Sequence, residues 1–186
     1  MFVLGHMGFG SKLAQPFSKD LNRRWVLLGT ILPDLIDKPL YYGLSAITHK
    51  RGNELGLIAG TRTIGHTGIF LVALSGLAVL RRSKLLGAVA LGVATHLFLD
   101  NFSDQFVSLI SSNTGPDQQV SSALVALLFP FYQPSFGASP FHGAREHLSH
   151  LSNTYTIVTE SLGAAILYWD YQRRKAAKVI LRTQSS

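Results

Sequence analysis

Histidines and carboxylates recur in this sequence at spacings that metal sites use. His96 and Asp100 are four residues apart, and His142 and Glu146 have the same separation. Residues spaced in this way lie on one face of a helix, so each pair can direct an imidazole nitrogen and a carboxylate oxygen to one ion. Because the chain contains no cysteine, any metal must be held by His, Asp or Glu.

Other candidate ligands stand at the ends of apolar segments. His66 opens a segment expected to run antiparallel to the one that carries His96, and His6 begins the first apolar segment. Asp34 and Asp37 follow Pro33, which is expected to interrupt a helix, so that carboxylates there can leave helical register and bridge metals. The candidate metal ligands are His6, Asp34, Asp37, His66, His96, Asp100, His142 and Glu146.

This ligand set favours a divalent metal, zinc first, and the number of ligands suits about two or three ions. Such ions lower the pKa of bound water to about 7 and clamp the oxygens of a phosphoester, so hydrolysis is the expected reaction class. In that reaction Asp34 or Asp37 would orient the attacking water, and Arg62 would steady the phosphate. His49, His147 and His150 are expected to be ordinary polar residues.

The composition suggests that lipid surrounds the elements that carry these residues. Hydrophobic residues make up 47% of the 186 residues and charged residues 15%, whereas soluble domains have about 25% charged residues. Short apolar segments of helical composition recur without an internal repeat or a linker. The sequence therefore predicts a single domain over residues 1–186, an all-α and compact helical bundle embedded in a membrane.

Helices are expected over residues 63–80 and 85–105, joined as a hairpin, and over residues 3–17, 22–37 and about 153–182. The second of the N-terminal pair should be broken at Pro33 and followed by a looped stretch, and residues 122–132 should form a re-entrant or interfacial piece. Residues 66–80 rise only about 22 Å, short of the roughly 30 Å hydrocarbon core, so tilt or a thinned bilayer is expected.

Charge is sorted between the two ends if these helices alternate in direction. Most of the 17 basic residues, among them Arg23, Arg82 and Arg174, fall at one end with both tryptophans, and all seven histidines fall at the other. The positive-inside tendency places the basic end in the cytoplasm of a multi-pass inner-membrane protein. The expected partner is the lipid bilayer, and no nucleic acid is expected because aromatics do not interleave with the basic residues.

Four short motifs carry a resemblance that covers about residues 5–105: GHMGFG, LPDLIDK, TRTIGHT and THLFLD. In this order they resemble the prokaryotic membrane-bound metal-dependent hydrolase family, with its LexA-regulated hydrolase-like members. The acidic motif departs from the family by one extra residue between Asp34 and Asp37, and Lys38 stands where many members have His. The resemblance therefore leaves open which of the two Asp residues binds metal.

The order of the ligands is also distantly similar to that of zinc-dependent phospholipases C and single-strand-specific zinc nucleases, which are helical enzymes. That similarity implies a phospholipase C-like arrangement of metal ligands and a phosphoester substrate, with a phospholipid as one candidate. Two alternatives stay open: a non-catalytic metal-binding membrane protein, and a soluble phospholipase C-like enzyme. A metal transporter is disfavoured because few polar residues continue along 68–95 toward the basic end.

Overall fold

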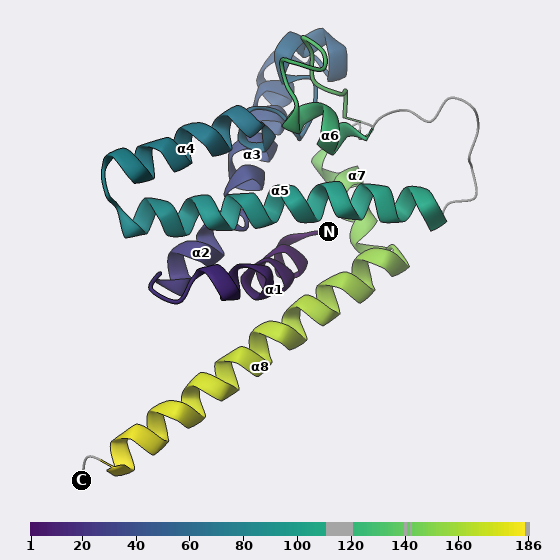
Figure 1. Cartoon of the computed structure of the whole chain (residues 1–186). Coiled ribbons are helices and arrows are strands. Elements are labelled where there is room, and N and C mark those ends of the chain that lie inside the picture. Colours follow the sequence, from purple (N-terminus) through teal and green to yellow (C-terminus); the bar gives the residue numbers. More distant parts are fainter. Residues whose placement is uncertain (111–120, 140, 142, 185–186) are drawn as a thin grey trace.

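The structure, a computed structural model, describes residues 1–110, 121–139, 141 and 143–184 (Figure 1). Within these ranges the chain forms eight α-helices and no strand, which confirms the predicted all-α fold. The helices are α1 Val3–Ala14, α2 Arg23–Gly29, α3 Leu32–Thr48, α4 Gly68–Leu80, α5 Lys84–Ile110, α6 Ser122–Leu127, α7 Ala144–Ser149 and α8 Thr154–Gln184. Short 3-10 turns lie between them, at η1 Gln15–Phe17, η2 Gly52–Ile58, η3 Ile64–His66 and η4 His150–Ser152.

Helix α5 is the central element of the bundle. It packs against α4, α2, α1 and α6, and α1 in turn packs against α8. Figure 1 shows α4 and α5 as an antiparallel hairpin, while α8 runs obliquely past α1 and extends away from the other helices. The predicted hairpin around residues 81–84 is therefore confirmed, and every helix that packs on α5 can present residues to its middle.

Glycines let α2 and α5 approach until their backbones touch. A Cβ atom on Gly29 would lie 2.2 Å from the carbonyl oxygen of Val89, and one on Gly92 would lie 2.2 Å from that of Val26. Small residues at crossing points are typical of helices that pack within membranes. The close approach places the end of α2 directly against α5, one turn before His96.

Pro33 does not break a helix as the sequence predicted. The chain leaves helical form at Thr30 and Ile31, and α3 then starts at Leu32 with Pro33 in its first turn. Proline is favoured there because its missing N–H would have no helical acceptor. The stretch after Asp37, expected to be looped, is helical to Thr48, so that prediction is wrong.

The apolar segment 63–80 also begins later than predicted. Thr67 caps α4 by accepting a hydrogen bond from the backbone N–H of Phe70, at 3.0 Å. Residues 64–66 form the separate turn η3, so His66 precedes the helix instead of opening it. The short segment from Ser122 contains only α6, which ends at Leu127 before a bent stretch.

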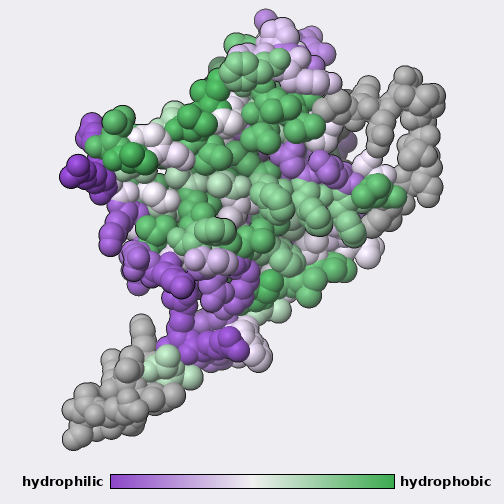
Figure 2. Space-filling view, viewed as in Figure 1, coloured by the Kyte–Doolittle hydropathy of each residue, from purple (hydrophilic) through white to green (hydrophobic). Residues whose placement is uncertain are grey.

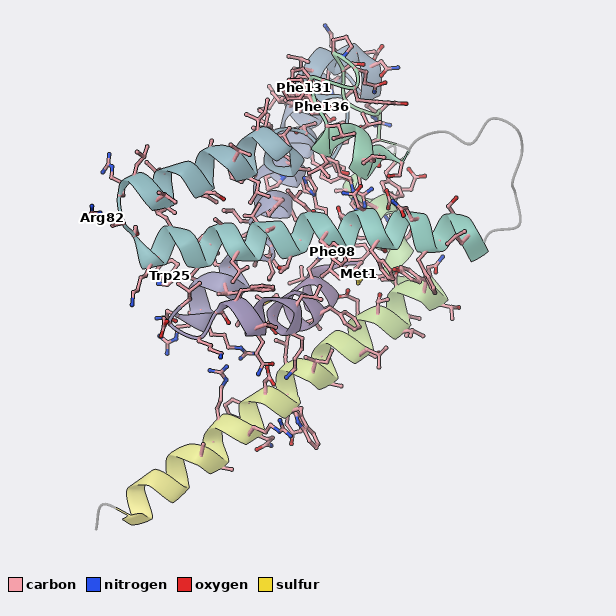
Figure 3. All side chains as sticks on the ribbon, viewed as in Figure 1. Met1, Trp25, Arg82, Phe98, Phe131 and Phe136 are labelled. Carbon is pink, nitrogen blue, oxygen red and sulfur yellow. The ribbon has the colours of Figure 1, made fainter. Side chains whose placement is uncertain are left out.

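One helix in the described part of the chain is long and apolar enough to cross a membrane. This is α5, over Lys84–Leu109, while the apolar helix α4 is shorter. In Figure 2 hydrophobic side chains cover much of the visible face over α4 and α5, between hydrophilic patches. Exposed side chains of this kind include Val72, Val79, Phe98 and Phe102. Figure 3 shows Trp25 and Arg82 at the same end of the molecule.

The backbone contact between α2 and α5 yields a stability prediction. Gly92→Ala should lower the free energy of unfolding by about 1–3 kcal/mol, because the new methyl group meets a backbone carbonyl that cannot move aside. Gly87→Ala is the matched control on the same helix, since a Cβ there meets nothing within 4 Å. Thermal unfolding of the purified variants in detergent measures both, and equal midpoints for the two variants would contradict the packing described.

Candidate metal centre

Four elements bring imidazoles and carboxylates to one buried point. His96 and Asp100 come from α5, His6 from α1, Asp34 from α3, and His66 from the turn η3. His6, His66 and His96 are each at most 1% exposed. The group His6, His96 and Asp100 and the group Asp34, His66 and His96 each place one ligand atom per residue within 4.8 Å of the others. The two groups share His96, so they form one continuous cluster.

The backbone of α2 fixes the ring of His96. The Nδ1 atom of His96 lies 2.8 Å from the carbonyl oxygen of Thr30, just beyond the glycine contact between α2 and α5. A carbonyl oxygen only accepts hydrogen bonds, so Nδ1 must carry the hydrogen and donate it. In the neutral ring the lone pair then lies on Nε2, which points into the cluster.

Asp37 fixes His66 in the same way. Its Oδ2 lies 2.7 Å from Nδ1 of His66, and its carboxylate also accepts the backbone N–H groups of Thr63 at 2.7 Å and Gly65 at 2.9 Å. The carboxylate is fully buried and its oxygens are engaged behind the imidazole. Asp37 was expected to be a metal ligand or to orient water; the structure places its carboxylate behind the His66 ring and outside both ligand groups. Asp34 is the acidic residue of this motif that faces the cluster.

The Nε2 atoms of His66 and His96 lie 3.1 Å apart. Because Nδ1 of each ring donates to an outer acceptor, the two Nε2 lone pairs face one another unless a proton or a cation lies between them. Two lone pairs repel, so this contact needs a proton on one nitrogen or a cation between them. The arrangement is the pattern of a metal-binding histidine, whose other nitrogen donates to an outer carbonyl or carboxylate.

The separations within the cluster fit a shared metal ion. Zinc bonds of about 2.0–2.1 Å to nitrogen or oxygen place neighbouring tetrahedral ligands about 3.3 Å apart. Oδ1 of Asp100 lies 3.3 Å from Nε2 of His6. Oδ2 of Asp100 lies 3.5 Å from Nε2 of His66 and 3.9 Å from Nε2 of His96. Asp34 Oδ1 lies 3.7 Å from Nε2 of His66. The donor set and its spacing therefore fit a divalent metal such as zinc.

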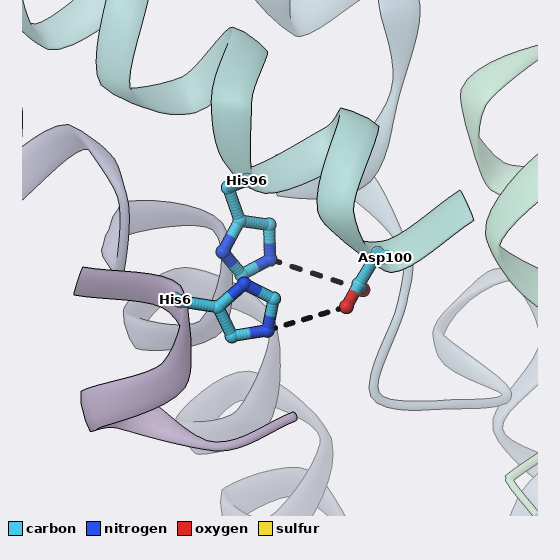
Figure 4. Close-up of side chains that lie close together, drawn as sticks. All are labelled: His6, His96 and Asp100. Carbon is cyan, nitrogen blue, oxygen red and sulfur yellow. Dashed lines mark ion pairs between the residues drawn. The ribbon is translucent and has the colours of Figure 1, made fainter. Parts of the chain in front are cut away.

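Figure 4 shows His6, His96 and Asp100 at close range, with both imidazoles directed at the carboxylate. The rings of His6 and His96 stack with centroids 4.1 Å apart. Buried Nδ1 of His6 has no hydrogen-bond partner among the described residues, so no outer acceptor selects its tautomer as Thr30 and Asp37 do for the other two rings.

Two basic side chains balance the carboxylates. Arg62 forms an ion pair from Nε to Asp100 at 2.9 Å and donates hydrogen bonds from a terminal nitrogen to Asp104 at 2.7 Å and to Ser122 at 2.9 Å. Burial alone would lower the pKa of Arg62, but Asp100 and Asp104 raise it above its ordinary value. Lys38 donates to Asp34 at 2.6 Å. Burial would raise the pKa of Asp34, but the charge of Lys38, followed by the nearby histidines, lowers it to about 2.

A cavity of about 390 Å³ gives access to this cluster. Both acidic residues of the cluster and both basic residues that balance them line it. The rest of its wall includes the first two residues, further residues of α5, residues 137–139 and 141, and single residues of α6, α7 and α8. Lining residues include Phe2, Asp34, Lys38, Arg62, Asp100, Asp104, Val107, Ser122 and His147. A small polar molecule can therefore reach the carboxylates without crossing the helix packing.

The second candidate pair, His142 and Glu146, is not part of the described cluster. His142 lies outside the described residues. Glu146 is exposed on α7 and belongs to neither of the two ligand groups.

Burial, then Tyr41 and Glu146, raises the pKa of Tyr42 to about 12, and the Tyr42 hydroxyl lies 2.6 Å from Nδ1 of His147. His147, expected to be an ordinary polar residue, lines the cavity mouth.

Sequence reasoning missed Glu160, which sets the start of α1. Its carboxylate accepts the backbone N–H groups of Phe2 at 2.7 Å, Leu4 at 2.8 Å and Gly5 at 3.1 Å. These donors would otherwise be unsatisfied at the helix N-terminus, next to His6. The available signal was an acidic residue among the mainly apolar residues of 157–169, where a partly buried carboxylate needs hydrogen-bond donors.

The model of the YdjM inner membrane protein family matches residues 1–179. The chain belongs to this family. All four motifs that carry the sequence resemblance lie within the matched residues, and each supplies at least one residue of the cluster. No curated protein and no solved structure matches the chain.

The role of Asp37 can be tested through stability. Asp37→Asn should lower the free energy of unfolding by about 2 kcal/mol, because an amide NH₂ replaces one acceptor and then faces a buried donor. Asp20→Asn is the control, since Asp20 is exposed on the surface. Thermal unfolding in detergent measures the difference, and an Asp37→Asn protein as stable as the control would show that the carboxylate does not hold this turn.

Proposed function

We propose that this member of the YdjM family is a metal-dependent hydrolase that acts on a phosphoester within the inner membrane. The observation that carries the proposal is the contact between the Nε2 atoms of His66 and His96. Outer acceptors prepare both atoms as metal ligands, and a cavity opens onto the carboxylates of Asp34 and Asp100 beside them. Zinc is the metal that best suits a site of imidazole and carboxylate.

His66, His96 and Asp100 would hold one ion, and His6 and Asp34 lie close enough to complete its coordination or to hold a second. When bound, such ions supply a nucleophilic water at neutral pH and stabilise charge on the phosphoester oxygens. Asp34 lies at the cavity wall, where its carboxylate can orient a water molecule. Asp37 holds His66, and Arg62 holds Asp100 while its positive charge faces the same cavity.

The cavity suits a phosphate that belongs to a lipid. Lys38 and Arg62 place positive charge on its wall, which favours a phosphate anion. Val107 also lines it and is exposed, and the exposed side chains of Phe102 and Phe106 stack one turn apart on the same helix. A phospholipid could therefore place its head group in the cavity and its acyl chains along the apolar surface of α5.

One observation favours a non-catalytic alternative. Arg62 already pairs with Asp100 and Lys38 with Asp34, so the two cluster carboxylates have counter-ions without any metal. A network of this kind could serve the structure alone, either as an ion-pair network or around a structural metal. The soluble phospholipase C-like alternative is disfavoured by membership of an inner membrane protein family.

We further propose a multi-pass arrangement with the basic end in the cytoplasm and the cluster near the opposite surface. Support comes from Arg81, Arg82 and Lys84 at the α4–α5 turn and from the basic last turns of α8. Aromatic side chains exposed beside them, such as Trp169, suit a membrane interface.

Metal content and hydrolysis test the proposed function together. Purified protein in detergent should contain zinc by elemental analysis and should hydrolyse phospholipids or a generic phosphodiester. His96→Ala should lose the metal and lower kcat by at least about 10³-fold, because it removes the ligand shared by both groups and with it the activated water. Asp100→Ala should lose metal and activity as well.

His49→Ala is the matched control, because His49 is exposed at the end of α3. It should keep both metal and activity. Metal retained in well-folded His96→Ala protein would remove the assignment of the site. If His96→Ala loses the metal but the wild type shows no detectable hydrolysis, the non-catalytic alternative is favoured.

The absence of cysteine allows a direct test of the orientation. Asn53→Cys, on the histidine side, should react with a membrane-impermeant maleimide in spheroplasts, which expose the outer surface of the inner membrane. Gln172→Cys, at the basic end, should react only after the membrane is permeabilised. Both residues are exposed. The reverse labelling pattern would overturn the proposed orientation.

A further inference from the structure

A second cavity, of about 640 Å³, lies at the basic end of the bundle. It is formed by the end of α1, the turn η1, the start of α2 and the middle of α8, and no histidine lines it. Its lining residues are Ser11, Lys12, Gln15, Pro16, Ser18, Lys19, Leu21, Arg23, Val26, Asp170 and Arg174. It is separate from the metal centre, because His6 lies near the start of α1 and Lys12 in its last turn.

Positive charge in this cavity exceeds its negative charge. Four basic side chains line it, Lys12, Lys19, Arg23 and Arg174, together with the single carboxylate of Asp170. Lys12 and Arg23 both pair with that carboxylate, at 2.6 Å and 2.9 Å. One carboxylate therefore serves two cations, and the other two basic residues face the same space.

The excess of positive charge affects the half-buried guanidinium of Arg23. Burial, and then the nearby charge of Arg174, lower the pKa of Arg23 from its ordinary value, against the opposite influence of Asp170. Two guanidinium groups that line one cavity and repel one another are stabilised by an anion between or beside them. Arginine forks match the oxygens of phosphate in particular, and lysines add charge at any angle.

The surroundings indicate where such an anion would come from. Phe17, in the turn that forms one wall, is 74% exposed, and Trp169, which precedes Asp170 in the chain, is also exposed, with the Arg173 guanidinium 5.4 Å from its ring centroid. Exposed aromatics beside basic residues are typical of the membrane interface, where phospholipid head groups lie. The volume lies within the range of small-molecule sites, which is about 300–1,000 Å³.

We propose that this cavity is a binding site for the phosphate group of an anionic phospholipid. Lys19, Arg23 and Arg174 contact the phosphate oxygens, Asp170, which also pairs with Lys12, holds Arg23 in place, and Phe17 lies against the lipid. The site binds without chemistry and does not depend on the proposed hydrolase activity, because it contains none of the candidate metal ligands. A free phosphate ester offers the same group, so the test separates the two sources.

The experiment uses the full chain purified in a non-ionic detergent and follows tryptophan fluorescence during titration. The separate ligands are short-chain phosphatidylglycerol, phosphatidylcholine of equal chain length, and inorganic phosphate. Phosphatidylglycerol should bind most tightly. The double variant Lys19→Gln, Arg174→Gln should weaken this binding by about tenfold or more, since charge-assisted hydrogen bonds are lost, while the ion pairs to Asp170 remain.

The matched control is Arg81→Gln, Arg82→Gln, which removes the same charge from the same end but from the turn between α4 and α5. It should bind phosphatidylglycerol as the wild type does. Inorganic phosphate that binds as tightly and with the same sensitivity to the cavity variant would support the phosphate site with a soluble source. Equal weakening by the control, equal binding of phosphatidylcholine, or no binding at all would overturn the proposal.

Discussion

The structure of the cluster depends on two hydrogen bonds that leave lone pairs facing each other. The carbonyl of Thr30 holds the Nδ1 hydrogen of His96, and the carboxylate of Asp37 holds that of His66. The Nε2 atoms then meet at 3.1 Å, so either one of them carries a proton or a cation lies between them. A bound cation converts this repulsion into shared coordination, which is why the outer acceptors matter as much as the ligands.

The helix packing positions the residues of the cluster. The glycine contact between α2 and α5 brings Thr30 within reach of His96, and Glu160 of α8 holds the start of α1 beside His6. Buried carboxylates are costly, and Arg62 and Lys38 offset that cost at Asp100 and Asp34. The histidine end thus contains a nearly balanced network, whereas the basic end keeps an excess of positive charge for an external anion.

Much of this arrangement could be predicted from the sequence. The apolar segments gave the all-α fold and the α4–α5 hairpin, and the spacing of His96 and Asp100 placed both on one helix face. The contact of the Thr30 carbonyl with His96 could not be predicted, because sequence periodicity carries no information on which backbone carbonyl meets a side chain. Nor could the sequence predict that Asp34 faces the cluster while Asp37 lies behind His66, because that difference depends on the turn at residues 64–66. Pro33 misled since proline both breaks helices and favours their first turn.

The most direct test of the central claim is the tautomeric state of the two imidazoles, read by ¹⁵N NMR of histidine-labelled protein purified with its metal and again after chelation. In the metal-loaded protein we expect Nδ1 of both His66 and His96 to carry a hydrogen and Nε2 of both to be unprotonated. The Nε2 signals of both rings should shift when the metal is removed. If either ring is instead a doubly protonated imidazolium whose signals do not respond to zinc or to chelation, a shared proton holds the cluster together, and the assignment of a metal centre is contradicted.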